Sequence, residues 1–227
     1  TLNPSSAASD VYKRQVIPYA AQWDEDGHIP KELWPKSAEV GILGLGYPEE
    51  FGGVSEGIDI WYTIILNEEM ARVAVGGVGA TLMVHGIGLP PIINFASDDV
   101  KAMVVPPVLA GTERISLAIT EPGAGSDVAQ LTTTASLEGD HYVVNGSKTY
   151  ITGGMNANWL TTAVRTGGDG AGGISVLLIP TDVEGVSRTA LDKKQGWWCS
   201  DTATIYFDNV RVPAGYLVGQ ENKGFSV

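Results

Sequence analysis

An apolar stretch that opens into a glycine-rich loop is the strongest candidate for chemistry in this sequence. Residues 117–127 read LAITEPGAGSD, so a predicted buried strand ends in a segment that is nearly free of side chains. Residues 123–125 (GAG) let another molecule approach the backbone closely, and their N–H groups can point toward it. Thr120 and Ser126 add hydroxyl groups beside the same gap. The pattern by itself favours a tight connection between two strands over a binding loop, because glycine-rich turns are common.

Side chains that carry metal or thiol chemistry are few. The single cysteine, Cys199, excludes an intrachain disulfide and a zinc site built from cysteines. The three histidines, His28, His85 and His141, lie far apart and lack the spacing of metal ligands. We therefore predict no metal site.

Composition and charge restrict the partners of the protein. The 227 residues are 44% hydrophobic and 18% charged, which is typical of an ordinary globular protein. The formal net charge is −12, and the densest basic stretches are only pairs, so we expect no nucleic-acid partner. No run approaches the ~18 apolar residues of a spanning helix, and the amino end lacks the pattern of a secretion signal. We predict a cytoplasmic protein without a membrane span.

Helical patterns fill the first half of the chain. One helix is predicted to start near Pro30 and to end at the glycines that follow it. Apolar residues along one face predict a second helix over 58–75. A third is predicted over 78–95, and Ser97 is predicted to cap a fourth that runs toward Leu109.

After about Gly111 the pattern changes to closely spaced strands joined by short turns. The pair Asn145 and Gly146 is the strongest hairpin signal, because both residues tolerate positive φ, and it predicts a turn between two strands. Many short strands without helices between them are typical of an antiparallel sandwich or barrel. The predicted fold class is α+β, with a helical domain followed by an antiparallel β-barrel or sandwich domain. The predicted strands are 115–119, 131–135, 141–144, 148–152, 159–165, 174–180, 203–207 and 210–212.

Five segments in the same order resemble signature segments of the acyl-CoA dehydrogenase family. The glycine-rich loop, TEPGAGSD, looks like the flavin-binding signature of that family, and the other four segments flank it on both sides. The similarity covers nearly all of the chain outside the amino-terminal tail. The segments are 47–53 (YPEEFGG), 120–127 (TEPGAGSD), 144–153 (VNGSKTYITG), 196–202 (GWWCSDT) and 207–213 (FDNVRVP).

The resemblance implies a division of the chain into domains. Residues 16–112 are similar to the family's helical amino-terminal domain, and 113–220 to its β-barrel middle domain, which binds flavin and acyl-CoA. Residues 221–227 would begin a carboxy-terminal helical domain that is missing here. Residues 1–15 show no periodicity and are Ser- and Ala-rich, so we interpret them as a disordered tail or an artefact.

The resemblance further implies FAD as the cofactor, with its isoalloxazine ring against the middle domain. Thr120 matches a contact to the pyrimidine side of the ring, and Thr152 matches a hydroxyl near flavin N5. Ser126 matches a contact to the pyrophosphate and to acyl-CoA, and Tyr150 an aromatic wall where many members carry Trp. The positions that match flavin contacts are Leu117, Ile119, Thr120, Gly125, Ser126, Tyr150, Ile151 and Thr152.

The reaction so implied is the α,β-dehydrogenation of an acyl-CoA thioester, with an α-proton removed by a carboxylate and hydride transferred to flavin N5. The family's base is a Glu in the carboxy-terminal domain, so we predict no catalytic residue within this chain and little activity for the chain alone. Glu121 is interpreted as a loop or structural carboxylate. The implied partners are acyl-CoA, an electron-transfer flavoprotein or similar acceptor, and further copies in a homotetramer or dimer. In a eukaryote the implied location is the mitochondrial matrix.

Two other functions fit the same sequence. One is a flavin-dependent monooxygenase of the same fold, which activates oxygen and lacks the catalytic Glu. The other is a helical-plus-β module without a cofactor that serves in assembly. Flavin absorbance after addition of FAD to the full-length protein would exclude the second alternative.

Overall fold

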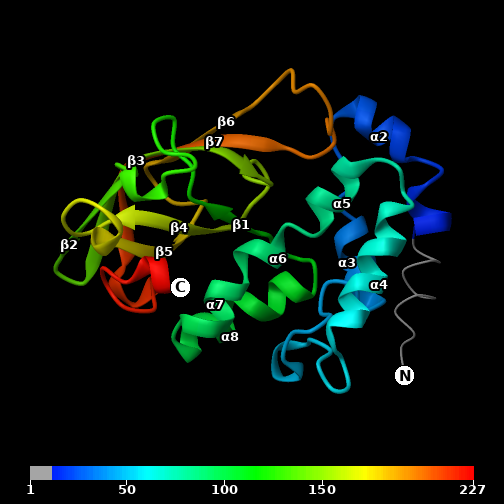
Figure 1. The fold of residues 1–227 in the computed structure, drawn as a ribbon, viewed down its shortest axis with the longest axis horizontal. Helices are drawn as coiled ribbons and strands as arrows, with labels where there is room; N and C mark the ends of the chain where they lie inside the picture. The colour runs from blue at the N-terminus through cyan, green and yellow to red at the C-terminus, as the bar shows by residue number, and fades with distance from the viewer. Residues whose placement is uncertain (1–11) are drawn as a thin grey trace. The chain divides into compact units, whose positions relative to one another are not determined.

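The computed structural model describes residues 12–227, which form two compact units (Figure 1). The first unit contains the described residues up to Met83 together with Val105–Glu113 and Lys193–Asp201. The second unit contains Val84–Val104, Arg114–Asp192 and Thr202–Val227. Most of the predicted amino-terminal tail lies outside the described residues.

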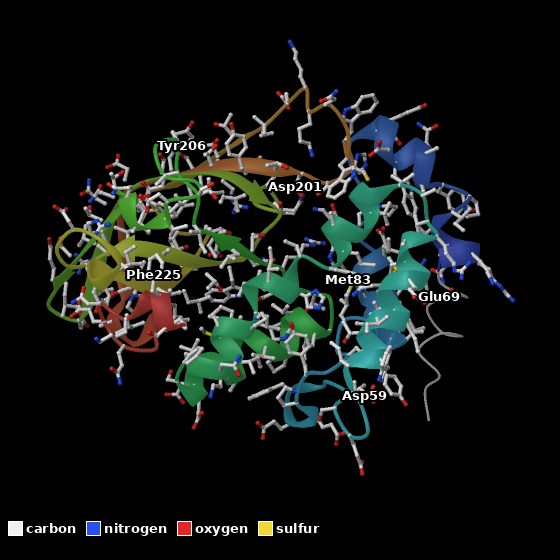
Figure 2. All side chains as sticks on the ribbon, in the orientation of Figure 1. Asp59, Glu69, Met83, Asp201, Tyr206 and Phe225 are labelled. Carbon is white, nitrogen blue, oxygen red and sulfur yellow. The ribbon has the colours of Figure 1, made fainter. Side chains whose placement is uncertain are left out.

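The first unit is built from helices around an apolar core. After a short π-helical turn, η1 (Tyr12–Val16), it contains α2 (Ala20–Asp26), α3 (Leu33–Glu39), α4 (Ile60–Ala71) and α5 (Gly76–Leu82). Asp59, labelled in Figure 2, is the N-cap of α4. Its carboxylate accepts a hydrogen bond from the Trp61 N–H at 3.0 Å. The core includes Leu33, Leu43, Leu66, Val78 and Leu82.

The third predicted helix, over 78–95, is divided into three in the structure. Helix α5 is followed by α6 (His85–Gly88) and α7 (Pro90–Phe95). Pro90 and Pro91 carry no N–H to continue the hydrogen-bond ladder of a preceding helix, so α7 starts anew with proline in its first turn. The fourth helix, α8 (Asp98–Leu109), runs as predicted, and the Ser97 hydroxyl accepts a hydrogen bond from the Val100 N–H at 3.4 Å. Across residues 12–227, no single helix is long and apolar enough to cross a membrane.

The second unit carries an eight-stranded sheet in the order β6-β7-β3-β2-β4-β5-β8, with β1 paired to β4 (Figure 1). The prediction of helices followed by strands is confirmed, but the sheet is mixed and open. Strand β4 pairs in parallel with β1 and, at one position, with β2, whereas the remaining pairs are antiparallel. The antiparallel barrel or sandwich is therefore only a loose description of this sheet. The strands are β1 (Ile115–Ala118), β2 (Thr134–Glu138), β3 (His141–Thr152), β4 (Trp159–Arg165), β5 (Ile174–Pro180), β6 (Val186–Ala190), β7 (Thr202–Pro213) and β8 (Leu217–Val218).

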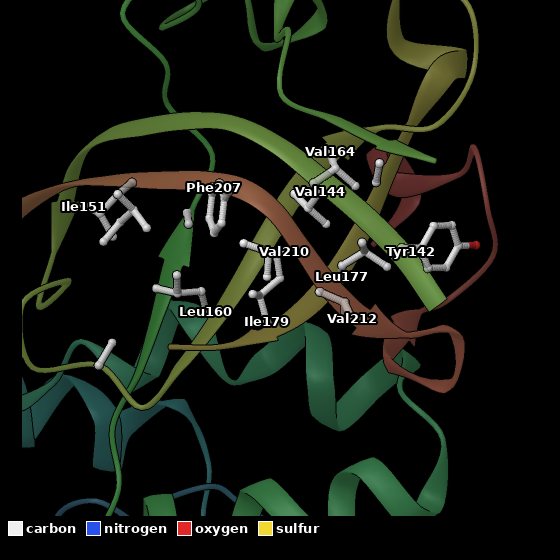
Figure 3. Packing of buried hydrophobic residues seen from close by; sticks show 14 of the residues in the cluster. Tyr142, Val144, Ile151, Leu160, Val164, Leu177, Ile179, Phe207, Val210 and Val212 are labelled. Atoms are coloured by element: carbon white, nitrogen blue, oxygen red, sulfur yellow. The ribbon is translucent and has the colours of Figure 1, made fainter. Parts of the chain in front are cut away.

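The core of this unit comes from alternate residues of the strands. Tyr142 and Val144 of β3 lie beside Val210 and Val212 of β7, and Leu177 of β5 packs in the same cluster (Figure 3). Side chains of one strand alternate between the two faces, so alternate apolar residues of β3 and β7 point inward together. Strand β5 is buried almost throughout, which explains its continuous apolar sequence.

The predicted hairpin turn at residues 145–146 is wrong, because these residues lie inside the continuous strand β3. Its pairing with β7 shifts register between Val144 and Gly146, and the Asn145 side-chain oxygen accepts a hydrogen bond from the Asn209 N–H at 2.9 Å. The shift is a β-bulge in which β7 carries the extra residue, and Asn209 has a φ of 52° there. The two predicted strands over 203–212 likewise merge into one bulged strand, β7.

Gly146 is required in this bulge for two reasons. Its φ is 143°, and a Cβ at this position would lie 2.6 Å from the Thr133 hydroxyl oxygen and 2.7 Å from the Thr133 Cα. Few residues other than glycine adopt this conformation. Because Gly146 has no Cβ, the segment around Thr133 can lie directly against β3.

We expect Gly146→Ala to lower the free energy of unfolding by on the order of 3 kcal/mol, from backbone strain and overpacking together. The matched control is Gly139→Ala, which also has a positive φ, of 66°, but no atom within 4 Å of the added Cβ. That control should lose only about 1–2 kcal/mol. Urea denaturation of both variants measures the difference, and equal losses would show that the contact with Thr133 is unimportant.

Candidate functional site

The glycine-rich loop follows β1 and begins with a tight turn. The Glu121 N–H donates to the Ala124 carbonyl at 2.9 Å, and the Ala124 N–H donates to the Glu121 carbonyl at 3.1 Å. Pro122 and Gly123 are exposed at the tip of this turn, and Gly125 and Ser126 are exposed after it. The loop therefore presents backbone, with hardly any side chain, to its surroundings.

Gly123 and Gly125 are not needed for the geometry of this turn. Neither residue has a positive φ, and a Cβ added at either one would meet no atom within 4 Å. Among residues 12–227, nothing accepts a hydrogen bond from the N–H of Gly125 or of Ser126. The two glycines thus leave an open space beside backbone donors, which is the arrangement that a bound anionic group can use.

A buried ion pair lies where this loop meets the sheet. The Lys148 ammonium donates to the Glu121 carboxylate at 2.7 Å, and the two side chains are 0% and 4% exposed. The same carboxylate accepts hydrogen bonds from the Thr132 N–H at 2.6 Å, the Thr132 hydroxyl at 2.8 Å and the Thr133 N–H at 2.9 Å. The ammonium also donates to the Ile119 carbonyl at 3.0 Å. Each buried charge is therefore paired and hydrogen-bonded, as burial requires.

These contacts decide the protonation of Glu121. Burial raises its pKa, but the hydrogen bond from Lys148 and those from Thr133 and Thr132 outweigh burial and lower the pKa to about 2. Burial lowers the pKa of Lys148, and the adjacent carboxylate acts in the opposite direction. Glu121 is thus ionised at neutral pH, with its carboxylate engaged by Lys148, Thr132 and Thr133.

The end of β3 turns one side chain outward beside the loop. The register with β7 shifts a second time, between Lys148 and Ile151, and Tyr150 in this bulge has a φ of 57°. Tyr150 is 64% exposed, whereas Ile151 is buried and Thr152 is half-buried. A non-glycine residue with such a φ is strained and is retained where the surroundings hold it.

The structure brings part of the predicted site together. The Thr149 N–H donates to the Thr120 carbonyl at 2.8 Å, so the residues after β1 lie directly beside the end of β3. Leu117 lies within β1, where it pairs with Thr161 of β4, and it is half-buried like Ile119 and Thr120. Within the described chain, no hydrogen bond joins Gly125 or Ser126 to residues 150–152.

Lys148, Thr132 and Thr133 were not predicted as part of the site. The predicted hairpin placed Lys148 at the start of a strand, next to polar residues, so nothing in the local pattern indicated its burial. Only the pairing of residues that are 27 apart in the sequence shows that Lys148 points inward to Glu121.

Other reactive groups of the described chain do not form a second site. Burial, together with the neighbouring Asp24, raises the pKa of the Cys199 thiol to about 12, so this cysteine is not a nucleophile at neutral pH. Within residues 12–227, His, Cys, Asp and Glu form no group of three or more suited to a metal ion.

The low pKa of Glu121 predicts how stability depends on pH. Its pKa in the folded protein, about 2, lies below the ordinary value of 4.5, so its contribution to stability is complete above pH 4.5 and is lost as the pH falls toward 2. We expect Glu121→Gln to be less stable than the wild type at neutral pH, by roughly 3–5 kcal/mol, because Lys148 then lacks a counter-charge. The difference should narrow as the pH falls from 4.5 to 2. Denaturant unfolding at several pH values tests this, and a constant difference would contradict it.

Comparison of this chain with known proteins identifies one family. The family model for the acyl-CoA dehydrogenase N-terminal domain matches residues 5–112, and the model for the acyl-CoA dehydrogenase middle domain matches residues 116–210. Acyl-CoA dehydrogenase AFT10-1 of Alternaria alternata is 37% identical over 224 residues, which cover 93% of this chain and 52% of that protein. The chain spans about half the length of the curated relatives it matches.

Solved structures lead to the same family. The crystal structure of a probable acyl-CoA dehydrogenase from Mycobacterium abscessus has a TM-score of 0.94 and 48% identity, covering 98% of this chain and 59% of that one. A glutaryl-CoA dehydrogenase from Mycobacterium smegmatis in complex with FADH2 has a TM-score of 0.88 and 26% identity, covering 99% of this chain and 56% of that one. By its two domains and its structural likeness, the chain belongs to the acyl-CoA dehydrogenase family.

Proposed function

We propose that this chain is the flavin-binding part of an FAD-dependent dehydrogenase that oxidises an acyl-CoA thioester between its α and β carbons. The observation that carries the proposal is the open backbone at Gly123 and Gly125, together with the bulge of β3 that exposes Tyr150. Membership of the acyl-CoA dehydrogenase family and the FADH2 complex of one structural neighbour support the same cofactor.

The residues of the loop and of β3 fit such a cofactor. The unused N–H groups of Gly125 and Ser126 would bind the pyrophosphate, because backbone donors in an open turn suit an anion without a basic side chain. The exposed ring of Tyr150 would cover the isoalloxazine, and the Thr152 hydroxyl would donate a hydrogen bond near N5. The bound flavin would supply the hydride acceptor.

Residues of β1, of the segment that follows it and of β3 complete the proposed contacts. Leu117, Ile119 and Thr120 would contact the pyrimidine side of the ring, and Ile151 would support the ring from β3. The hydrogen bond from the Thr149 N–H to the Thr120 carbonyl supports this grouping. A hydrogen bond to the pyrimidine side stabilises the charge that develops on a reduced flavin.

Acyl-CoA is the proposed substrate, with Ser126 contacting it from the loop. We place the catalytic base outside this chain, in a carboxy-terminal helical domain, because Glu121 is ionised but fully engaged with Lys148 and two N–H groups. The proposed domains are 16–112 and 113–220, with 221–227 leading into the next domain. The whole enzyme would form a homotetramer or dimer and pass electrons to an electron-transfer flavoprotein, in the cytoplasm or in a mitochondrial matrix.

We expect residues 1–227 alone to have little or no dehydrogenase activity, even with added FAD, because we place the base for the α-proton in another domain. Turnover of acyl-CoA with an artificial electron acceptor measures this, and the full-length protein under the same conditions is the control. Robust turnover by the 227-residue chain would refute the assignment of the base to another domain.

We expect Gly125→Val to weaken FAD binding by about 10-fold or more, because the side chain would fill the space proposed for the pyrophosphate. The free energy of unfolding should change by less than about 0.5 kcal/mol, since a Cβ at Gly125 meets no protein atom within 4 Å. Titration of the full-length apoprotein with FAD measures the affinity.

The matched control for this variant is Gly168→Val, in the exposed loop between β4 and β5. Gly168 also lacks a positive φ and has no atom within 4 Å of an added Cβ, but it lies outside the proposed site. It should bind FAD like the wild type. Equal affinity of both variants would remove the loop from the proposed site.

A further inference from the structure

The Glu121 carboxylate joins the two ends of the glycine-rich loop. Its two oxygens accept hydrogen bonds from the N–H groups of Thr132 and Thr133, at 2.6 and 2.9 Å, so the residues on both sides of the loop are joined through one side chain. Residues 122–131 therefore form a loop with its two ends held together. Gly125 and Ser126 lie within it.

Lys148 connects the joined ends of this loop to strand β3. Its ammonium bridges the Glu121 carboxylate and the Ile119 carbonyl, at 2.7 and 3.0 Å, while the next N–H along β3, that of Thr149, donates to the Thr120 carbonyl at 2.8 Å. Two consecutive residues of β3 thus hold the carbonyl groups of two consecutive residues after β1. The proposed ring wall, Tyr150, follows directly on β3.

A third link connects the far end of the loop to the same strand. The Thr133 hydroxyl donates to the Ser147 carbonyl at 3.2 Å, and the absence of a Cβ at Gly146 allows this close approach. The end of β1, both ends of the loop and the bulged part of β3 consequently meet at one polar cluster, made of Glu121, Lys148, Thr132 and Thr133.

Stability alone does not account for a charged cluster at this place. Lys148 is the largest of the fully buried side chains, and removing two charges from water costs free energy that their attraction does not reliably repay. Apolar residues of similar volume often replace a buried ion pair with no loss of stability. Apolar residues could not bind the Ile119 carbonyl and the N–H groups of Thr132 and Thr133. The charged side chains of Glu121 and Lys148 therefore fix the position of the backbone around them.

We infer that Glu121 and Lys148 are positioning residues for the flavin, which hold Ile119 and Thr120, the loop over 122–131 and the bulge at Tyr150 in a single binding geometry. Neither residue needs to touch the cofactor. The inference rests on the proposed function, because the groups that the cluster holds are those proposed to contact FAD.

The test compares FAD binding with stability in the full-length apoprotein. The variants are Glu121→Gln, Lys148→Met and the double variant, which removes both charges and so leaves neither one buried alone. We expect the double variant to recover stability relative to the single variants and yet to bind FAD at least about 10-fold more weakly than the wild type, as when groups that orient a ligand's contacts are lost. The circular dichroism of the bound flavin should change as well.

Leu177→Ala is the control for a general loss of stability, since Leu177 is fully buried in the sheet core and is not part of the cluster. This variant should have a lower melting temperature than the wild type, but the same FAD affinity and flavin spectrum. This outcome, together with a weakly binding double variant, supports the inference.

Three results would overturn it. A double variant with the affinity and flavin spectrum of the wild type would show that the pair does not position the cofactor. A double variant that does not fold would assign the pair to stability. A wild-type protein that binds no FAD would refute the proposed function itself and the inference with it, whereas the first two results refute the inference alone.

Discussion

The burial of one ammonium group constrains the whole region around the candidate site. Lys148 lies in the interior of the second unit with no exposed side-chain surface, and a buried charge must be paired and hydrogen-bonded. Glu121 satisfies this requirement only if the residues after β1 turn inward. Its carboxylate in turn needs donors, which the backbone at Thr132 and Thr133 provides. The geometry of the glycine-rich loop follows from this chain of requirements.

The pairing of β3 with β7 is irregular at two positions, and these irregularities meet the requirements. The first irregularity is next to Gly146, whose missing Cβ lets Thr133 approach the strand, and the second lies between Lys148 and Ile151. A regular strand alternates strictly, so a bulge is needed to change which side chains face the interior. The second bulge leaves Lys148 and Thr149 both buried and Tyr150 exposed, with φ in the left-handed region. Strain of this kind is concentrated at functional sites, which agrees with the role proposed for Tyr150.

In the glycine-rich loop, the carboxylate and the open backbone serve different purposes. Glu121 lies in the signature loop and is ionised at neutral pH, yet every hydrogen bond it accepts comes from Thr132, Thr133 or Lys148. A carboxylate with a pKa of about 2 is also a weak base for an α-proton. The loop instead offers open backbone at Gly123 and Gly125, which suits binding and not proton transfer.

The sequence by itself determined the family and several of the elements. Strands β4 and β5 and helix α8 lie where local patterns predicted them, because apolar runs and a serine cap act over a few residues. The order of strands, the mixed pairing of β4 and the bulge at Gly146 were decided by tertiary structure. The same holds for Lys148, because its burial depends on a carboxylate 27 residues away and on two N–H groups beyond the loop. Local propensity cannot describe a charge whose partners are set by packing.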